Sequence, residues 1–192
     1  FVLCLTLLPT ATFAADETDM PQGTGTAEDP YLIGTLDELK WFRDAVNDGN
    51  TGISAKLTAD IVLENPWTPI GDSSNAYTGT FNGGWHKISG KEITADTQNW
   101  GLFGSIGEDG TVQALMVNIS TFDVTANATQ SGVIAAQNAG TIERCAVQIS
   151  TKFTFKVSLG LIAYENSGLI ANCRGAMTQP SSNNGDAVNV AG

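Results

Sequence analysis

The fold of this chain is decided by two stretches that nearly repeat each other, GVIAAQNAGTIERCAVQIS at Gly132–Ser150 and GLIAYENSGLIANCRGAMT at Gly160–Thr178. Each carries a cysteine at the same place, Cys145 in the first and Cys173 in the second. Self-similarity at a period of about 20–50 residues is typical of solenoids and other repeat arrays. The interval between these two stretches falls in that range, so we expect a fold of stacked coils.

Two sets of spaced glycines extend the repeat along the chain. The first set, which we call the anchoring glycines, recurs at nearly equal intervals: Gly79, Gly110, Gly140 and Gly168. The second set recurs at intervals of similar length: Gly101, Gly132 and Gly160. Gly192 follows Gly160 by one more such interval and predicts the start of a further repeat. Glycine suits positions where φ is positive or where two backbones approach closely, so we interpret both sets as structural.

Apolar residues after each anchoring glycine follow the period of a β-strand. They lie at positions +2, +5, +7 and +9, which in one coil are Val112, Leu115, Val117 and Ile119. Steps of two indicate strand alternation, and the step of three predicts a bend between two short strands. A further alternating stretch precedes each new repeat, at Phe122 and Val124, at Phe153, Phe155 and Val157, and at Val188 and Val190. Each coil should therefore contain about three short strands.

These patterns predict an all-β fold, a parallel β-helix (β-solenoid) of about four coils. Equivalent residues of successive coils should line up inside it, as Val112, Ile142 and Ile170 and as Leu115, Cys145 and Cys173. Two interpretations of the cysteines stay open. They are stacked thiols that act as small apolar residues, or they form a disulfide between neighbouring coils.

One segment has the period of a helix, TLDELKWFRDAVND at Thr35–Asp48. Thr35 and Glu38 form a capping-box pattern, and Gly49 follows as a stop signal. Its apolar face holds Leu36, Leu39, Phe42 (or Trp41) and Val46. We expect this amphipathic helix to cap the N-terminal end of the solenoid, whose strand edges would otherwise be exposed. The segment KLTADIVL (Lys56–Leu63) alternates and predicts an early strand.

The two ends of the chain and its charge bound its location and partners. Residues 1–14 (FVLCLTLLPTATFA) resemble the later part of a secretory signal, and residues 15–30 form a lead-in to a solenoid at 31–192 that we expect to be truncated at its C-terminal end. A secreted or cell-surface location follows, and no later segment is apolar enough to insert into a membrane. The chain carries 20 acidic and 9 basic residues, a net charge of −11. This excess of acids argues against nucleic acid as a partner.

The repeat resembles that of bacterial surface proteins built from GLUG motifs. GLFG at Gly101–Gly104 matches the motif, and GVIA and GLIA match it with alanine in the last place. GTGTAEDPYLIGTLDEL resembles the lead-in before such solenoids, and YTGTFNGGWHKISG resembles their recurrent turn. The resemblance implies a secreted, adhesin-like β-solenoid without implying an activity.

No residue pattern in the chain points to catalysis, a cofactor or a metal. The single histidine, His86, is interpreted as a turn residue, and no nucleophile-elbow motif accompanies it. Three tryptophans near turns, Trp67, Trp85 and Trp100, are candidates for stacking on sugar rings if exposed, and for filling the first coils if buried.

The function predicted from these features is a non-catalytic extracellular module, an adhesion or binding segment or a stalk of a larger bacterial protein. Its partner would be a host or cell-wall glycan or protein. The alternative is a polysaccharide-degrading lyase or glycoside hydrolase on a β-helix, since such enzymes also use this architecture.

Overall fold

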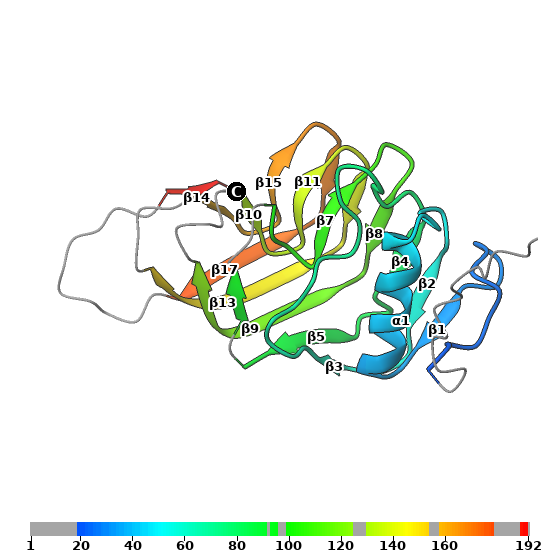
Figure 1. Cartoon of the computed structure of the whole chain (residues 1–192). Helices are drawn as coiled ribbons and strands as arrows, with labels where there is room; N and C mark the ends of the chain where they lie inside the picture. The colour runs from blue at the N-terminus through cyan, green and yellow to red at the C-terminus, as the bar shows by residue number, and fades with distance from the viewer. Residues whose placement is uncertain are drawn as a thin grey trace, which may run out of the picture.

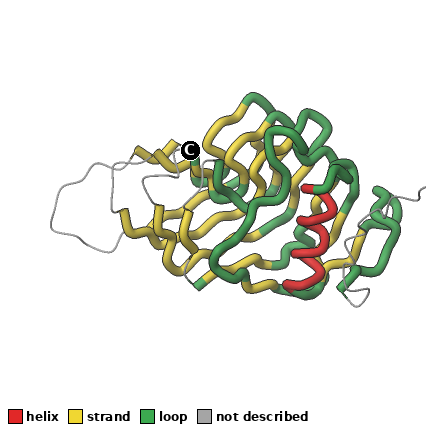
Figure 2. Tube along the Cα trace, viewed as in Figure 1, coloured by secondary structure: helices red, strands yellow, loops and turns green. Residues whose placement is uncertain are grey.

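The computed structural model describes residues 19–91, 93–95, 99–124, 130–153, 158–178 and 189–191. The predicted signal segment at 1–14 and the predicted strand residues Phe155, Val157 and Val188 lie outside these ranges. Figures 1 and 2 show strands stacked from the helix at one end, α1 (Leu36–Asn47), to β17 (Arg174–Thr178) at the other. All the pairings between these stacked strands are parallel, which confirms the predicted β-solenoid.

Two of the four sheets in the described part of the chain run the length of the solenoid. Sheet A contains, in spatial order, β1 (Tyr31–Ile33), β2 (Ala55–Leu57), β4 (Thr80–Asn82), β8 (Thr111–Gln113), β12 (Thr141–Glu143) and β16 (Leu169–Ala171). Sheet B contains β3 (Ile61–Val62), β5 (Lys87–Gly90), β9 (Met116–Val124), β13 (Ala146–Phe153) and β17, with β6 (Ile93–Ala95) also paired to β9.

Two shorter sheets complete the regular coils. Sheet C contains β7 (Phe103–Ile106), β11 (Ala135–Asn138) and β15 (Ala163–Asn166). Sheet D contains β10 (Ser131–Gly132), β14 (Ser158–Gly160) and β18 (Asn189–Ala191). A regular coil therefore has four strands, in the chain order C, A, B, D, and the expectation of about three was wrong. The alternating residues Phe122 and Val124 continue β9 and do not form a strand of their own, because β9 and β13 stay paired through a register shift after Ile149.

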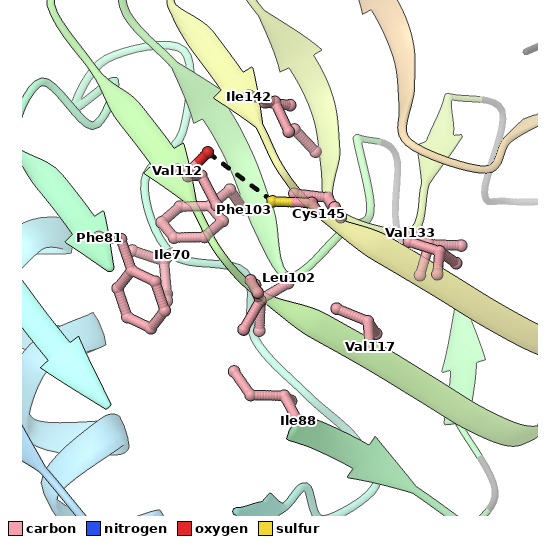
Figure 3. Packing of buried hydrophobic residues seen from close by; sticks show 14 of the residues in the cluster. Ile70, Phe81, Ile88, Leu102, Phe103, Val112, Val117, Val133, Ile142 and Cys145 are labelled. Atoms are coloured by element: carbon pink, nitrogen blue, oxygen red, sulfur yellow. Dashed lines mark hydrogen bonds between the residues drawn. The ribbon is translucent and has the colours of Figure 1, made fainter. Parts of the chain in front are cut away.

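The interior of the solenoid is built from ladders of equivalent residues. In sheet A, Phe81 pairs with Val112, Val112 with Ile142, and Ile142 with Ile170. Figure 3 shows Phe81, Val112 and Ile142 on successive strands, with their side chains directed into the interior. In sheet B, Ile88, Val117 and Val147 form a second ladder. Because the core is shared between coils, each coil depends on its neighbours to bury its apolar side chains.

The anchoring glycines are explained by close approach between coils. A Cβ on Gly140 would collide with the carbonyl oxygen of Gly110, and one on Gly168 would collide with that of Gly140. None of the anchoring glycines has a positive φ. Any side chain at these positions would push two coils apart, so glycine is required for the spacing of the stack.

Positive φ values instead occur at the corner between sheets A and B, on residues that are not glycine. Ala114, Arg144 and Asn172 occupy equivalent corners of successive coils with φ of 51°, 54° and 55°. The corner produces the step of three that the sequence showed between positions +2 and +5. For an L-residue this conformation costs roughly 1–2 kcal/mol, so the corner is held by the ladders on either side of it.

Helix α1 closes the N-terminal end as predicted. Thr35 is the N-cap, and both halves of the capping box form: the Glu38 N–H donates to Thr35 Oγ1 at 3.2 Å, and the Thr35 N–H donates to Glu38 Oε2 at 2.9 Å. Leu39, Phe42 and Val46 are completely buried. Phe42 packs edge-on against Tyr77 at 5.9 Å between ring centroids, so the helix is part of the core.

One smaller expectation needs correction. The segment KLTADIVL forms two strands, β2 and β3, because the chain turns from sheet A into sheet B at Thr58–Asp60. Gly192, predicted to start a further repeat, lies outside the described residues; β18 before it pairs with β14, with Ala191 opposite Gly160. The lead-in to the solenoid folds back on β1, where Gln22 makes an antiparallel bridge to Leu32.

The described part of the chain holds no helix with the length and apolar character that a membrane crossing requires.

Candidate functional site

The corner that precedes β5 carries an exposed aromatic side chain, Trp85. The segment Gly83–His86 makes this corner two residues longer than its counterpart at Ala114–Leu115. Gly84 and Trp85 both have positive φ, 56° and 63°, and the Trp85 N–H donates to the carbonyl of Ala114 at 2.8 Å. Trp85 remains 60% exposed. A strained backbone that presents a large apolar side chain to solvent has no evident benefit for stability, so the corner is a candidate binding feature.

A small charged cluster lies beside this corner. Asp60 Oδ1 accepts a hydrogen bond from the backbone N–H of Lys87 at 2.9 Å and lies 3.5 Å from His86 Nδ1, while Asp60 Oδ2 lies 3.5 Å from Lys87 Nζ. The hydrogen bond from the Lys87 N–H, supported by its ammonium group, holds the pKa of Asp60 below its ordinary value. His86 lies in the corner before β5, and its ring neighbour is a carboxylate from the turn between β2 and β3 of the preceding coil.

A groove of about 380 Å³ crosses the outer face of sheet B over β5, β9, β13 and β17. Side chains alternate along these strands, so Val117 and Val147 point to the core and their neighbours point outward. One outward row across the groove is formed by Lys87, Met116, Ala146 and Arg174. A second outward row includes Asn118 and Gln148. We call this hollow the sheet B groove.

Trp67 and Trp100 belong to the interior and are removed as stacking candidates. They are 4% and 2% exposed, respectively. Trp67 Nε1 donates to the carbonyl of Leu102 at 3.3 Å, and the guanidinium of Arg43 on α1 lies 5.2 Å from its ring centroid. Of the three predicted tryptophans, Trp85 alone is left with an accessible ring.

Cys145 and Cys173 are both free thiols, placed one above the other in successive coils. Each bonds in the same pattern: Cys145 Sγ contacts the carbonyl oxygens of Glu143 and Val112, and Cys173 Sγ contacts those of Ala171 and Ile142. Figure 3 shows the bond from Cys145 to Val112. The carbonyls of Glu143 and Ala171 also accept from the backbone N–H groups of Ala114 and Arg144, so each thiol adds a weak second donor to a carbonyl that is already paired. Burial raises the pKa of Cys145 to about 12.

Two acidic residues outside the charged cluster at Asp60 serve separate local structures. Glu64 accepts a hydrogen bond from Lys40 on α1 at 2.8 Å, and Asp72 caps a turn by accepting from the N–H groups of Ser74 and Asn75. Where the structure is described, three or more His, Cys, Asp or Glu side chains do not gather as a metal site would require.

Sequence reasoning missed the sheet B groove, although the signal was present. The apolar residues that predict the strands, at positions +5, +7 and +9 of each coil, point inward. Reading positions +6 and +8 would have picked out Met116, Ala146 and Arg174 as one outward row, and Asn118 and Gln148 as the next. It would not have included Lys87, because the longer corner at Gly83–His86 shifts that coil by two residues.

Comparison with known proteins places the repeat in much longer chains. No family model matches the sequence. It is 34% identical over 140 residues, 70% of this chain, to a protein of Evansella cellulosilytica that is provisionally named a Gly-rich membrane protein. It is 31% identical over 132 residues, 64% of this chain, to the protein named Halomucin of Haloquadratum walsbyi. The matches span only 16% and 1% of these two relatives.

Among solved structures, the chain is similar to a crystal structure from Bacteroides ovatus that is provisionally assigned as an immunoglobulin A1 protease. The alignment covers 88% of this chain and 84% of the other, with 14% sequence identity and a TM-score of 0.40.

Proposed function

We propose that this chain is a non-catalytic β-solenoid segment of a larger extracellular protein of the GLUG type, and that it acts as a binding module, or as a stalk, at the cell surface. The observation that carries the proposal is the unbroken parallel register of sheet A from β1 to β16. A column in which each coil is tied to the next by backbone hydrogen bonds is stiff and can display side chains at fixed intervals.

The sequence relatives and the surface of the molecule support this proposal. The chain matches a segment of a protein named as a membrane protein, and the match occupies a minor part of that protein's length. The outer surface offers an exposed aromatic ring at Trp85 and the sheet B groove. Ligand selectivity in such arrays resides in corners and outward rows that differ between coils, since the inward rows are constrained by packing.

A binding survey tests the proposal. The purified chain is immobilised and exposed to host extracellular proteins, to neutral and acidic glycans and to cell-wall polymers, with a heat-unfolded sample as the control. We expect saturable binding to at least one class by the folded protein alone. Binding to none of these classes would reduce the role to that of a spacer. Release of unsaturated or reducing-end products from a glycan would overturn the proposal in favour of an enzyme.

A further inference from the structure

The sheet B groove stands out from the rest of the molecule by its charge. The chain as a whole carries a net charge of −11 with 9 basic residues, yet two of these, Lys87 and Arg174, line the groove. Among the described residues that line it, none has a carboxylate. A groove with two cations and no acid in a strongly acidic protein is complementary to an anionic ligand.

The two cations are placed at the ends of one row. Lys87, Met116, Ala146 and Arg174 lie at equivalent positions on four successive strands. Three steps between strands put their Cα atoms about 14 Å apart along the solenoid axis. The ammonium of Lys87 has a loose contact with Asp60 at 3.5 Å, and Arg174 has no side-chain hydrogen bond or salt bridge to a described residue. Both cations can therefore pair with charges on an extended ligand that runs along the axis.

We propose that the sheet B groove binds an acidic polysaccharide, with carboxylates on separated sugar units paired to Lys87 and Arg174. This inference rests on the proposed function as a binding module and names its ligand class. The side chains between the two cations fit sugars. The amides of Asn118 and Gln148 can each donate to and accept from hydroxyl groups, and Met116 and Ala146 form a low apolar floor for the ring faces.

An acidic peptide is the competing class of ligand, and the structure favours it less. Peptides that bind to sheets commonly add a strand at an exposed edge, where backbone groups are unpaired. The groove is lined by β17, the last described strand of sheet B, and by β5, β9 and β13, which are central strands. A peptide added beside β17 would lie next to Arg174 but three strands away from Lys87, and the rest of the groove lies over the three central strands. Their backbone groups are occupied by the ladder. A ligand in the groove has to be recognised by outward side chains.

Titration calorimetry with hexagalacturonate tests the proposal. We expect binding at low ionic strength that weakens as salt is added, and no binding of the fully methyl-esterified oligomer, which has the same rings without charge. Arg174→Gln and Lys87→Gln should each weaken binding about three- to tenfold, because each removes one charge-assisted contact at an exposed site. Lys56→Gln, an exposed cation on β2 of sheet A, is the matched control and should bind like the unmodified protein.

A second variant tests the shape of the groove while both charges are kept. Ala146→Phe fills the middle of the row and should abolish binding, with folding verified by circular dichroism. The inference is overturned if hexagalacturonate does not bind, if Lys56→Gln is as damaging as Arg174→Gln, or if poly-glutamate competes more strongly than the glycan. Product formation from the glycan would instead overturn the non-catalytic function and leave the groove as its binding site.

Discussion

The two ends of the described solenoid differ in how completely their inward side chains are covered. At the N-terminal end, α1 lies across the first coils and its apolar residues Leu39, Phe42 and Val46 are fully buried. At the other end, the inward positions of the last described coil are only half-buried, as Ile170 and Cys173 show. The described residues include no segment that packs over β16 and β17 as α1 packs over the first coils. The difference teaches that the ladders alone do not seal a coil, since each coil needs a covering layer on both sides.

The size of the buried side chains also changes from the N-terminal end of the solenoid toward the other end. Near α1 the interior is filled by a cluster of aromatic rings, Phe42, Tyr77, Phe81 and Phe103, with ring centroids 5.3 to 5.9 Å apart. Further along, the ladders use smaller residues such as Ile142, Ala135 and Ala163. The coils next to α1 therefore bury larger side chains than the later coils do.

The largest expected contrast is in the reactivity of the two cysteines. Burial raises the pKa of Cys145 to about 12, against about 8.5 for an unperturbed thiol, so its thiolate fraction at pH 8 falls more than about a thousandfold. In a Cys4→Ser background, iodoacetamide should modify Cys173 far faster than Cys145, as measured by peptide mass spectrometry. In denaturant both should react at one rate. Equal rates in the folded protein would show that the coil of Cys145 is as open to solvent as the coil of Cys173.

Removal of the central aromatic of the helix should have the largest effect on stability. Phe42→Ala should lower the free energy of unfolding by about 3–5 kcal/mol, because it leaves a cavity between α1, Tyr77 and Phe81. Chemical denaturation followed by circular dichroism measures the loss. Lys40→Ala on the exposed face of α1 is the control and should cost less than about 1 kcal/mol. If the two variants lose equal stability, the helix is not part of the core.

A smaller contrast is expected within one ladder. Ile142→Ala should cost about 2–5 kcal/mol because Ile142 is completely buried. Ile170→Ala removes the same atoms one coil later and should cost less than half as much, because Ile170 is already partly in contact with water. The same denaturation experiment compares them. A cost for Ile170→Ala that matches Ile142→Ala would indicate that the last coil is covered in solution.

The smallest expected effect on stability concerns the left-handed residue at the corner between sheets A and B. Ala114→Gly should be neutral or should stabilise the protein by up to about 1 kcal/mol, because glycine relieves the positive φ at the expense of chain entropy. Ala135→Gly, in the buried strand β11, should instead destabilise by about 1–2 kcal/mol. Thermal unfolding of both variants gives the comparison. A loss at Ala114 as large as that at Ala135 would show that the left-handed corner carries no strain.

Much of the fold was predictable because its determinants are local or periodic. The capping box of Thr35 and Glu38 located α1 to within one residue at each end. The apolar spacing after each anchoring glycine predicted β8 and β9 and the corner between them. The fourth strand was missed because Gly132–Asn138 reads as one apolar stretch. The chain bends between Gly132 and Ala135, which separates β10 from β11, and the Ala135 carbonyl oxygen comes so close to Gly132 that a side chain there would collide with it.

The candidate site was less predictable, because it depends on which face of a turn the chain presents. Trp67, Trp85 and Trp100 all lie near turns, yet burial separates the first and third from the second. Trp85 lies in the corner at Gly83–His86, which has positive φ at Gly84 and Trp85 and is two residues longer than its counterpart at Ala114–Leu115. The sheet B groove depends on the register that brings Lys87 beside Met116, two residues away from the position that simple counting from the anchoring glycine would assign.

The longer corner at Gly83–His86 shows how this architecture tolerates unequal repeats. Asn82 still pairs with Gln113 and Lys87 with Met116, although four residues separate the first members of these pairs and only two separate the second. The two additional residues are accommodated in the corner, and the inward-facing residues on either side of it keep their pairing with the next coil. A gene segment that duplicates inexactly can therefore lengthen such a protein without a redesigned interior, provided that the added codons fall at this bend. New surface loops would then arise as a by-product of growth.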